Sequence, residues 1–244
     1  MQRIKLTISY LGTNYHGWQY QDNANTLQKE VESAIEKLFG QFCRVTGAGR
    51  TDEGVHALNY PLHFDAPKNI PLSKIVLGLN RFLPQDISAV SAQRVGDDFD
   101  ARKSAKSKTY LYRFYIDSAR QPFLDQTHLQ LYKQPDVEKM KRGGALFCGT
   151  HDFSAFARQG SNILGSVRTI YSLDICQEEN ILEITVKGNA FLYNMVRNIA
   201  GTLLWLGQGK LQTEDIETML SLKKRIKYFK TLPGKGLTFV QADY

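Results

Sequence analysis

The chain has 244 residues, of which 42% are hydrophobic and 11% aromatic, so it can bury the core of one large domain or two small ones. This composition excludes a disordered chain, a collagen-like chain and a small disulfide scaffold. The apolar runs are only a few residues long, far short of the roughly 20 that a membrane helix needs. The first residues lead straight into an alternating segment rather than an export signal, so we expect a cytoplasmic protein.

Three cysteines are widely separated and have apolar neighbours: Cys43, Cys148 and Cys176. Their odd number and spacing do not fit a disulfide framework or a zinc site. We expect reduced thiols that are buried as small hydrophobic groups, and no bound metal.

Basic residues are concentrated in two segments. Lysine and arginine total 31 against 24 acidic residues, a net charge of +7. Residues 101–120 contribute +5 and residues 221–235 contribute +6, so the rest of the chain sums to −4. This distribution favours contacts with phosphates, although two solvated charged faces would give the same counts. The basic segment at residues 101–120 also contains three tyrosines, Tyr110, Tyr112 and Tyr115. Their rings could stack on bases or line the buried face of a strand.

The first part of the chain predicts the order strand, helix, strand, strand, helix, strand. Alternating apolar residues predict a first strand that ends near Tyr10, and helical spacing after Thr26 predicts a capped helix that ends at Gly40. Further strands are predicted at residues 42–46, 56–64 and 87–95, with a helix that begins near Pro71. This order is that of a ferredoxin-like or RRM-like unit.

The second part of the chain repeats the theme less regularly. The predicted strands are residues 109–116, 170–176, 181–187 and 237–244, and the predicted helices are residues 137–147, 193–206 and 214–220. We therefore predict an α+β protein with two RRM-like or ferredoxin-like α/β domains, at residues 1–100 and 101–244, that are joined near residues 96–108.

The loop at residues 47–56 carries the strongest chemical signal. It combines three glycines with charged side chains, as in a loop that a substrate can approach closely. Asp52 lies near Arg50 and should stay ionised at neutral pH, and an ionised carboxylate can act as a nucleophile or a base. A surface Asx turn with Arg50 paired to Asp52 would give the same residues. His56 is expected to be structural, and no helix follows that would complete a phosphate-binding loop.

Residues 49–57, Gly-Arg-Thr-Asp-Glu-Gly-Val-His-Ala, closely resemble the active-site motif of the bacterial tRNA pseudouridine synthase A family, which usually has Ala at the position of Glu53. The resemblance extends over nearly the whole chain. Blocks similar to those of the family lie in the expected order at residues 10–21, 99–110, 151–156, 168–170, 189–191 and 195–199.

The resemblance implies an enzyme that isomerises uridine to pseudouridine in tRNA without a metal or cofactor. The glycosidic bond to nitrogen is broken, the uracil rotates, and a carbon–carbon bond to the ribose replaces it. By its position in the motif, Asp52 would be the essential carboxylate, acting as a nucleophile on the sugar or the base, or as a base at the ribose. Arg197 resembles the arginine that forms a salt bridge with this Asp.

Three more residues match family positions that contact the substrate. Tyr110 would stack on the target uracil and is placed for proton transfer, although a phenol with an ordinary pKa of about 10 is a poor base. Leu237 resembles the apolar residue on the other side of the uracil. Arg50 resembles the arginine that enters the RNA stem and holds the target nucleotide extruded, which the reaction requires because a stacked uridine is out of reach.

The resemblance also implies an architecture and partners. Family members have two RRM-like halves whose antiparallel sheets abut at a central active-site cleft, and they work as homodimers in which each tRNA contacts both subunits. Their substrates are uridines of the anticodon stem-loop. This chain departs from the family at residues 106–109, which hold fewer cations, and after Leu237, where an aromatic residue usually follows. The sequence therefore does not determine which uridines of the stem-loop are modified.

Two other classes of protein fit part of the pattern. A paired-RRM protein that binds RNA without catalysis would share the fold and charge, but no segment matches the aromatic RNP strand of a binding RRM. A glycoside hydrolase would need two cooperating carboxylates, whereas Asp52 and Glu53 are adjacent on an extended loop and would point in opposite directions.

Overall fold

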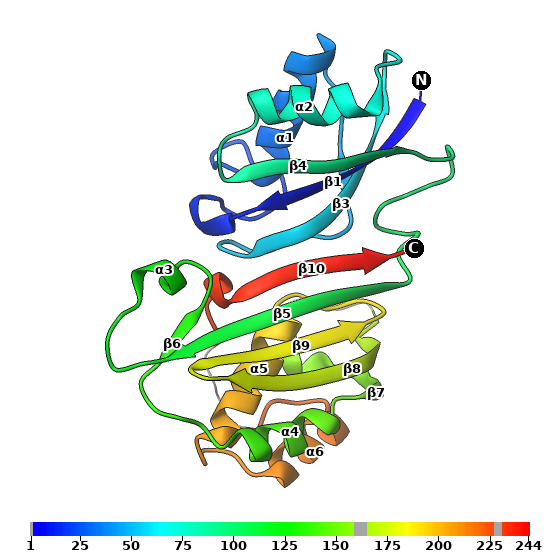
Figure 1. Cartoon of the computed structure of the whole chain (residues 1–244). Coiled ribbons are helices and arrows are strands. Elements are labelled where there is room, and N and C mark those ends of the chain that lie inside the picture. Colours follow the sequence, from blue (N-terminus) through cyan, green and yellow to red (C-terminus); the bar gives the residue numbers. More distant parts are fainter. Residues whose placement is uncertain (1, 159–164, 227–230) are drawn as a thin grey trace. The chain divides into compact units, whose positions relative to one another are not determined.

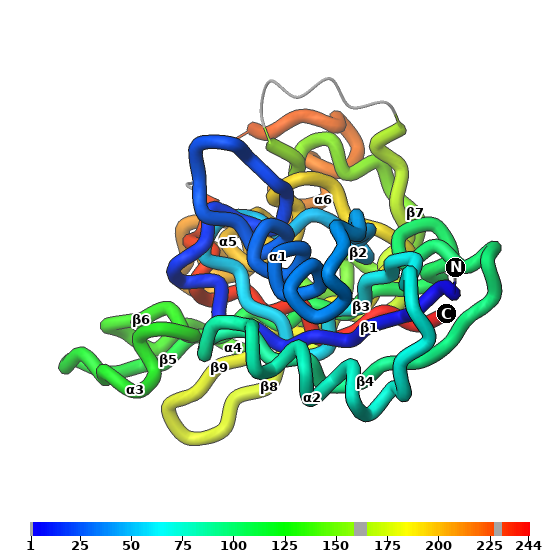
Figure 2. Tube along the Cα trace, turned by 90° about the horizontal axis from the view of Figure 1, so that it is seen from above, coloured from blue at the N-terminus to red at the C-terminus, as the bar shows by residue number. Residues whose placement is uncertain are grey.

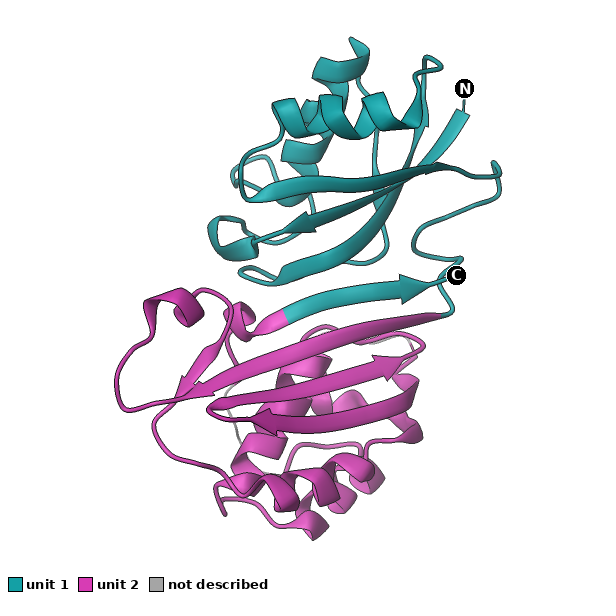
Figure 3. Cartoon of the chain, viewed as in Figure 1, with its two compact units in different colours: residues 1–106, 238–244 teal, residues 107–237 magenta. Residues whose placement is uncertain are grey.

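The computed structural model describes residues 2–158, 165–226 and 231–244 (Figure 1). The chain divides into two compact units, residues 1–106 with 238–244 and residues 107–237 (Figure 3). The mixed α+β class is confirmed, and most strand pairs are antiparallel.

The boundary between the units differs from the sequence prediction, which placed residues 101–244 together. The last strand, β10 (Leu237–Asp243), pairs in parallel with β3 (His56–Ala66), with Thr238 opposite His56. In addition, the Lys106 backbone N–H donates to the Asp243 carbonyl at 2.8 Å. Residues 101–106 and 238–244 therefore pack with the first unit, because the free edge of β3 supplies the partner that this last strand needs.

The first unit has the predicted order of elements. These are β1 (Gln2–Tyr10), the short helix η1 (Gly12–Asn14), α1 (Leu27–Phe39), β2 (Thr46–Gly47), β3, α2 (Leu72–Phe82) and β4 (Ile87–Arg94). β1 lies between β4 and β3 and pairs antiparallel with both, while β2 and β10 share the other edge of β3. Alternate residues of β1 (Ile4, Leu6, Ile8 and Tyr10) are buried, which confirms the predicted alternation.

Two local predictions in this unit need correction. Thr26 occupies the position before α1 and is fully buried, but its hydroxyl makes no capping hydrogen bond. The strand predicted at residues 42–46 is reduced to the two residues of β2. The buried carboxylate of Glu32 accepts the Val45 backbone N–H at 3.1 Å and so takes a donor that a strand would use.

The second unit is built on a sheet with the order β6-β5-β9-β8-β7. Its elements are β5 (Ser107–Ile116), α3 (Pro122–Asp125), β6 (Leu129–Leu131), α4 (Val137–Ala145), β7 (Gly149–Asp152), η2 (Ser154–Phe156), β8 (Val167–Glu178), β9 (Ile181–Gly188), α5 (Met195–Gly207), α6 (Thr213–Leu222) and η3 (Gly234–Gly236). β6 runs parallel to β5, beside α3 (Figure 2), and the other pairs are antiparallel. α4 packs on α5 and β8, and α5 contacts β5.

The three cysteines are free thiols, but only Cys43 is buried as predicted. Cys148 is half-buried. Cys176 is exposed because it lies at an outward position of β8, so the prediction of a buried thiol is wrong there. In the part of the chain that the structure describes, no helix is both long and apolar enough to span a bilayer.

Candidate active site

The loop that carries Arg50 and Asp52 lies between β2 and β3 in the first unit and is anchored from β3. The hydroxyl of Tyr60, a fully buried residue of β3, donates to the Gly49 carbonyl. The Ala48 backbone N–H donates to the Pro61 carbonyl at 2.9 Å. A strand, not a helix, follows the loop, as the sequence predicts.

The segment at residues 10–19 holds the same loop from its other side. The Trp18 backbone N–H donates to the Thr51 carbonyl at 3.0 Å, and the Thr51 hydroxyl is 3.0 Å from the Tyr10 hydroxyl. The Gly12 backbone N–H donates to Nδ1 of the buried His56 at 3.0 Å, so His56 has the structural role that was predicted. The segment at residues 10–19 therefore supports the loop that carries Asp52 from a second side.

Gly12 has a specific steric reason to lack a side chain. A Cβ built there would lie 2.0 Å from the Val55 carbonyl oxygen, a backbone atom of the loop. A residue larger than glycine can fit only if the loop moves away. The backbone of the N-terminal segment and that of the Asp52 loop are thus in direct van der Waals contact.

The charged side chains of the loop differ in exposure. Asp52 is half-buried, whereas Arg50 and Glu53 are exposed. Nε of Arg50 donates to Oε1 of Gln19 at 3.2 Å, and Nε2 of Gln19 donates in turn to Gln28 at 3.0 Å. The loop therefore presents a partly sheltered carboxylate and an exposed cation on a backbone that is fixed at both ends.

Tyr110, Arg197 and Leu237 belong to the second unit. Tyr110 lies on β5 opposite Val186 of β9 and is 9% exposed. Its ring meets that of Phe191 edge to face, with ring centres 5.1 Å apart. Tyr112 and Tyr115 of the same strand are fully buried, on opposite faces of β5, so both rings belong to the core and neither is available to stack on a base.

Arg197 is half-buried near the start of α5. Its Nε donates to the Leu232 carbonyl at 2.6 Å, and its NH1 donates to Oδ1 of Asn194 at 3.1 Å. Asn194 is the residue before the helix and has a left-handed backbone (φ 64°), a conformation that Asn adopts more readily than most residues. The guanidinium is therefore fixed by its own helix and by the segment that leads to Leu237.

Leu237 is 6% exposed and begins β10. Upstream of it, the Tyr112 hydroxyl donates to the Pro233 carbonyl at 2.8 Å. Burial raises the pKa of Tyr112, and the nearby positive charge of Arg197 opposes this only in part. The phenol therefore stays neutral and keeps its proton for the hydrogen bond.

The basic segments are not uniformly available to a polyanion. Arg102, Lys103, Lys106, Arg120, Lys223 and Lys224 are exposed. Arg225 donates to the Ala155 and Ala157 carbonyls, and Lys235 is paired with Asp125 at 2.9 Å. Lys227 and Lys230 lie outside the described residues. Part of the predicted phosphate-binding charge is thus used within the fold.

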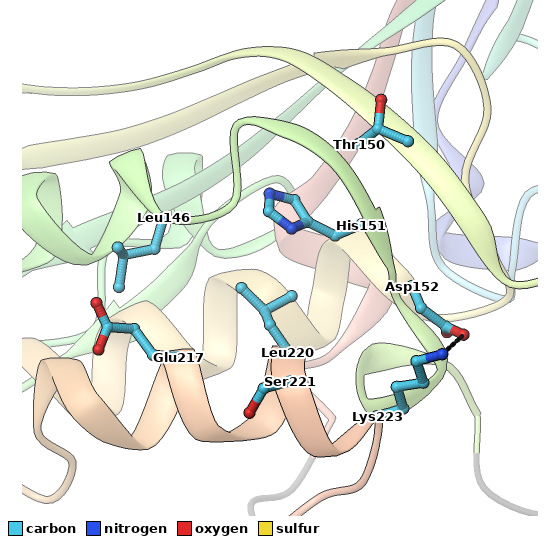
Figure 4. A pocket seen from close by; sticks show the side chains of 8 residues that line it. All are labelled: Leu146, Thr150, His151, Asp152, Glu217, Leu220, Ser221 and Lys223. Carbon is cyan, nitrogen blue, oxygen red and sulfur yellow. Dashed lines mark ion pairs between the residues drawn. The ribbon is translucent and has the colours of Figure 1, made fainter.

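A hollow of about 500 Å³ opens in the second unit between β7 and α6 (Figure 4). Asp152 and Lys223 form an ion pair of 3.7 Å on its wall, and Nε2 of His151 lies 2.9 Å from the Cys148 carbonyl. Burial opposes ionisation of Asp152, but hydrogen bonds from Ser166 and Ser154 outweigh it and lower its pKa. The residues around this hollow include none of the predicted site residues, and the described residues hold no cluster of His, Cys, Asp and Glu suited to a metal.

Sequence reasoning missed the side chains that support the site. Tyr60 anchors the Asp52 loop, Phe191 packs on Tyr110, and Asn194 orients Arg197. Phe191 lies within the block at residues 189–191 that resembles the family, so the sequence did point to it. In the sequence, Tyr60 is an ordinary aromatic residue of a strand and Asn194 an ordinary residue before a helix. Their roles are seen only from the hydrogen bonds in the structure.

The Asp52 loop therefore holds a partly sheltered carboxylate among glycines, where a substrate can approach closely. The family model described as tRNA pseudouridine synthase matches residues 6–102 and 145–244. The unmatched residues include Tyr110. These findings place the chain among the isomerases that form pseudouridine. It belongs to the tRNA pseudouridine synthase family, which confirms the resemblance of its active-site motif.

Individual relatives align over the whole chain. The tRNA pseudouridine synthase A of Caldicellulosiruptor bescii is 43% identical over 245 residues, and that of Ruminiclostridium cellulolyticum is 41% identical over 245 residues, each covering 100% of both chains. Among solved structures, a Cbf5-Nop10-Gar1 complex matches 82% of this chain and 45% of its own, with a TM-score of 0.38 and 12% identity.

Proposed function

We propose that this chain isomerises uridine to pseudouridine in the anticodon stem-loop of tRNA, with Asp52 as the essential carboxylate. The observation that supports it most directly is the coincidence of motif and geometry at residues 49–57. The residue at the family's catalytic position is half-buried, on a loop whose backbone is bonded to Tyr60 and Trp18. Such fixation is what a reacting group needs, because a misplacement of about 1 Å can cost roughly 100-fold in rate.

The other site residues keep the roles that the family resemblance implies. Tyr110 stacks on the uracil and Leu237 contacts its other side. Arg50 is exposed, and among the described residues it is bonded through Nε to Gln19, so its guanidinium can be redirected into an RNA stem at the cost of this exposed hydrogen bond. Arg197 supplies the fixed positive charge of the site. Asp52 acts either as a nucleophile on the sugar or the base, or as a base at the ribose.

The proposal extends to partners and location. A tRNA substrate fits the net charge of +7 and the exposed cations at residues 102–106 and at Lys224. We propose a cytoplasmic homodimer, as the family resemblance implies. Light scattering after size exclusion would distinguish a dimer from the 27.7 kDa monomer.

The decisive experiment is tritium release from tRNA labelled at carbon five of uridine. Isomerisation moves the ribose bond from nitrogen to this carbon, so the tritium leaves to water as the base nitrogen gains a proton. We expect release by the wild type, a loss of roughly 1000-fold or more in Asp52→Asn, and near-normal release in Glu53→Gln, the exposed neighbouring carboxylate. Filter binding should show that Asp52→Asn still binds tRNA.

Each alternative result has a clear meaning. Substantial release by Asp52→Asn would refute the assignment of the carboxylate. Pseudouridine mapped outside the anticodon stem-loop would refute only the substrate position. Binding of tRNA without release by the wild type would favour an RNA-binding protein without catalysis.

A further inference from the structure

The segment at residues 231–236, which leads directly to Leu237, is held by side chains from three elements of the second unit. Arg197 of α5 donates to the Leu232 carbonyl at 2.6 Å, and Tyr112 of β5 donates to the Pro233 carbonyl at 2.8 Å. Nζ of Lys235 donates to Oδ1 of Asp125 at 2.9 Å and to the Asp125 carbonyl at 3.0 Å. The segment is thus tied at three successive points before Leu237.

The Asp125 end of this tie is itself anchored. Asp125 ends α3, and its Oδ1 accepts a hydrogen bond of 3.3 Å from the hydroxyl of Tyr115, which is fully buried on β5. Lys235 therefore connects the segment to the sheet through α3 rather than to a freely moving surface group. The Lys235 hydrogen bond also lowers the pKa of Asp125, which keeps the carboxylate ionised at neutral pH.

Tyr112 contributes a second, steric restraint. A Cβ built at Gly236 would lie 2.6 Å from two atoms of the Tyr112 ring. The ring therefore packs directly against the backbone of the residue that precedes Leu237. Because the ring is fully buried, it cannot move aside without disturbing the core.

We propose that Tyr112 and the Asp125–Lys235 ion pair are positioning residues that set the place of Leu237 against the target uracil. This inference rests on the proposed function, in which Leu237 contacts the base. It gives Lys235 a role that its charge alone does not indicate, since a count of cations assigns it to the phosphates of tRNA.

The inference separates the rate of the reaction from the affinity for tRNA. Contacts with phosphates dominate the affinity for a nucleic acid. Because Lys235 is paired with Asp125, these contacts are made by other cations, and a change at Lys235 should not weaken binding. A loosened segment would let Leu237 and the extruded uracil take several positions, and only some of them react. The rate of a single turnover should therefore fall while the dissociation constant for tRNA stays the same.

The test compares single-turnover tritium release and tRNA binding in four variants: Asp125→Asn, Lys235→Met, the double variant, and the charge swap Asp125→Lys with Lys235→Asp. We expect each single change to slow release about tenfold and to leave tRNA binding within about twofold. The double variant should be no slower than either single variant, because both remove the same tie. The charge swap should be faster than either single variant.

Two further variants complete the design. Tyr112→Phe keeps the ring against Gly236 and removes only the bond to Pro233, so it should slow release with unchanged binding. Glu138→Gln is the matched control, since it breaks a Glu138–Lys141 ion pair of 2.8 Å on α4 and should leave the release rate unchanged. Thermal melting confirms that each variant is folded.

Three results would overturn the inference or its basis. Wild-type release rates in all the Asp125, Lys235 and Tyr112 variants would overturn it. Weaker tRNA binding by Lys235→Met alone, with a salt dependence reduced by about one charge, would assign Lys235 to a phosphate instead. No release by the wild type would refute the proposed function itself, which keeps the two failures distinguishable.

Discussion

The Asp52 loop, residues 47–56, and the segment that carries Leu237, residues 231–237, are both mostly irregular, but they are fixed by different means. The first is held mainly by backbone groups, at Trp18, Pro61 and Gly12, to which the hydroxyls of Tyr60 and Tyr10 add two side-chain contacts. The second is held by side chains, namely Tyr112, Arg197 and Lys235, that reach its carbonyls or pair with Asp125.

This difference has consequences for substitution. A contact between two backbones is broken by adding atoms, because there is no side chain to remove. A tie made by a side chain is broken by removing a single polar group, and the rest of the fold is left intact. We therefore expect substitutions at the Asp52 loop to affect both stability and activity, and those at the Leu237 segment to affect mainly activity.

The largest effect is expected for Gly12→Ala. The new methyl group would overlap the Val55 carbonyl oxygen, so the Asp52 loop must shift. We expect a loss of about 1–3 kcal/mol in the free energy of unfolding, measured by denaturant titration, together with a strongly reduced rate of tritium release. Thr13→Ala, an exposed change in the same short helix, is the control and should behave as the wild type. Unchanged stability in Gly12→Ala would contradict the close contact.

A smaller effect is expected from the hydroxyl pair beside Asp52. The Tyr10 and Thr51 hydroxyls are 3.0 Å apart, and both side chains are buried. Thr51→Val and Tyr10→Phe should each destabilise the fold, with a coupling energy of about 1 kcal/mol in a double-mutant cycle of unfolding measurements. Purely additive losses would mean that the pair contributes nothing to the loop.

The sequence predicted most regular elements because their patterns are local. Alternation defined β1, and helical spacing with a terminal glycine defined α1. The failures come from contacts between distant residues or from very short elements. Glu32 of α1 diverts the predicted strand at residues 42–46, and β6 and β7 are too short to show a period. Nothing in the local pattern of β10 indicates that β3 is its partner.

For the candidate site as well, local features could be predicted from the sequence and contacts between distant residues could not. Loop composition and the motif identify Asp52 without any structure, since glycines and charges are adjacent in the chain. The anchors of the site are not adjacent to it. Lys235 was counted as a phosphate-binding cation because its partner, Asp125, lies 110 residues earlier, and a charge count carries no information on pairing at that separation.

The smallest effect is expected for the pH dependence of the stability that the Asp125–Lys235 ion pair gives to the fold. The hydrogen bond from Lys235 lowers the pKa of Asp125 below its ordinary value of 3.8. Because the folded pKa is lower than the unfolded one, the ion pair stabilises the fold above the unfolded pKa, and this contribution is lost as the pH falls through the folded pKa. Both side chains are about one-third exposed, with 33% for Lys235 and 32% for Asp125, so the stabilisation should be less than about 1 kcal/mol.

The measurement is the difference in unfolding free energy between the wild type and Asp125→Asn. This difference should be largest near neutral pH at low salt, and it should shrink at a pH of about 3 or in about 1 M salt. A difference that is independent of both would show that the charge of Asp125 does not stabilise the fold. The tie to Lys235 would then act only by hydrogen bonding, and Asp125→Asn, which can still accept a hydrogen bond, should keep most of the catalytic rate.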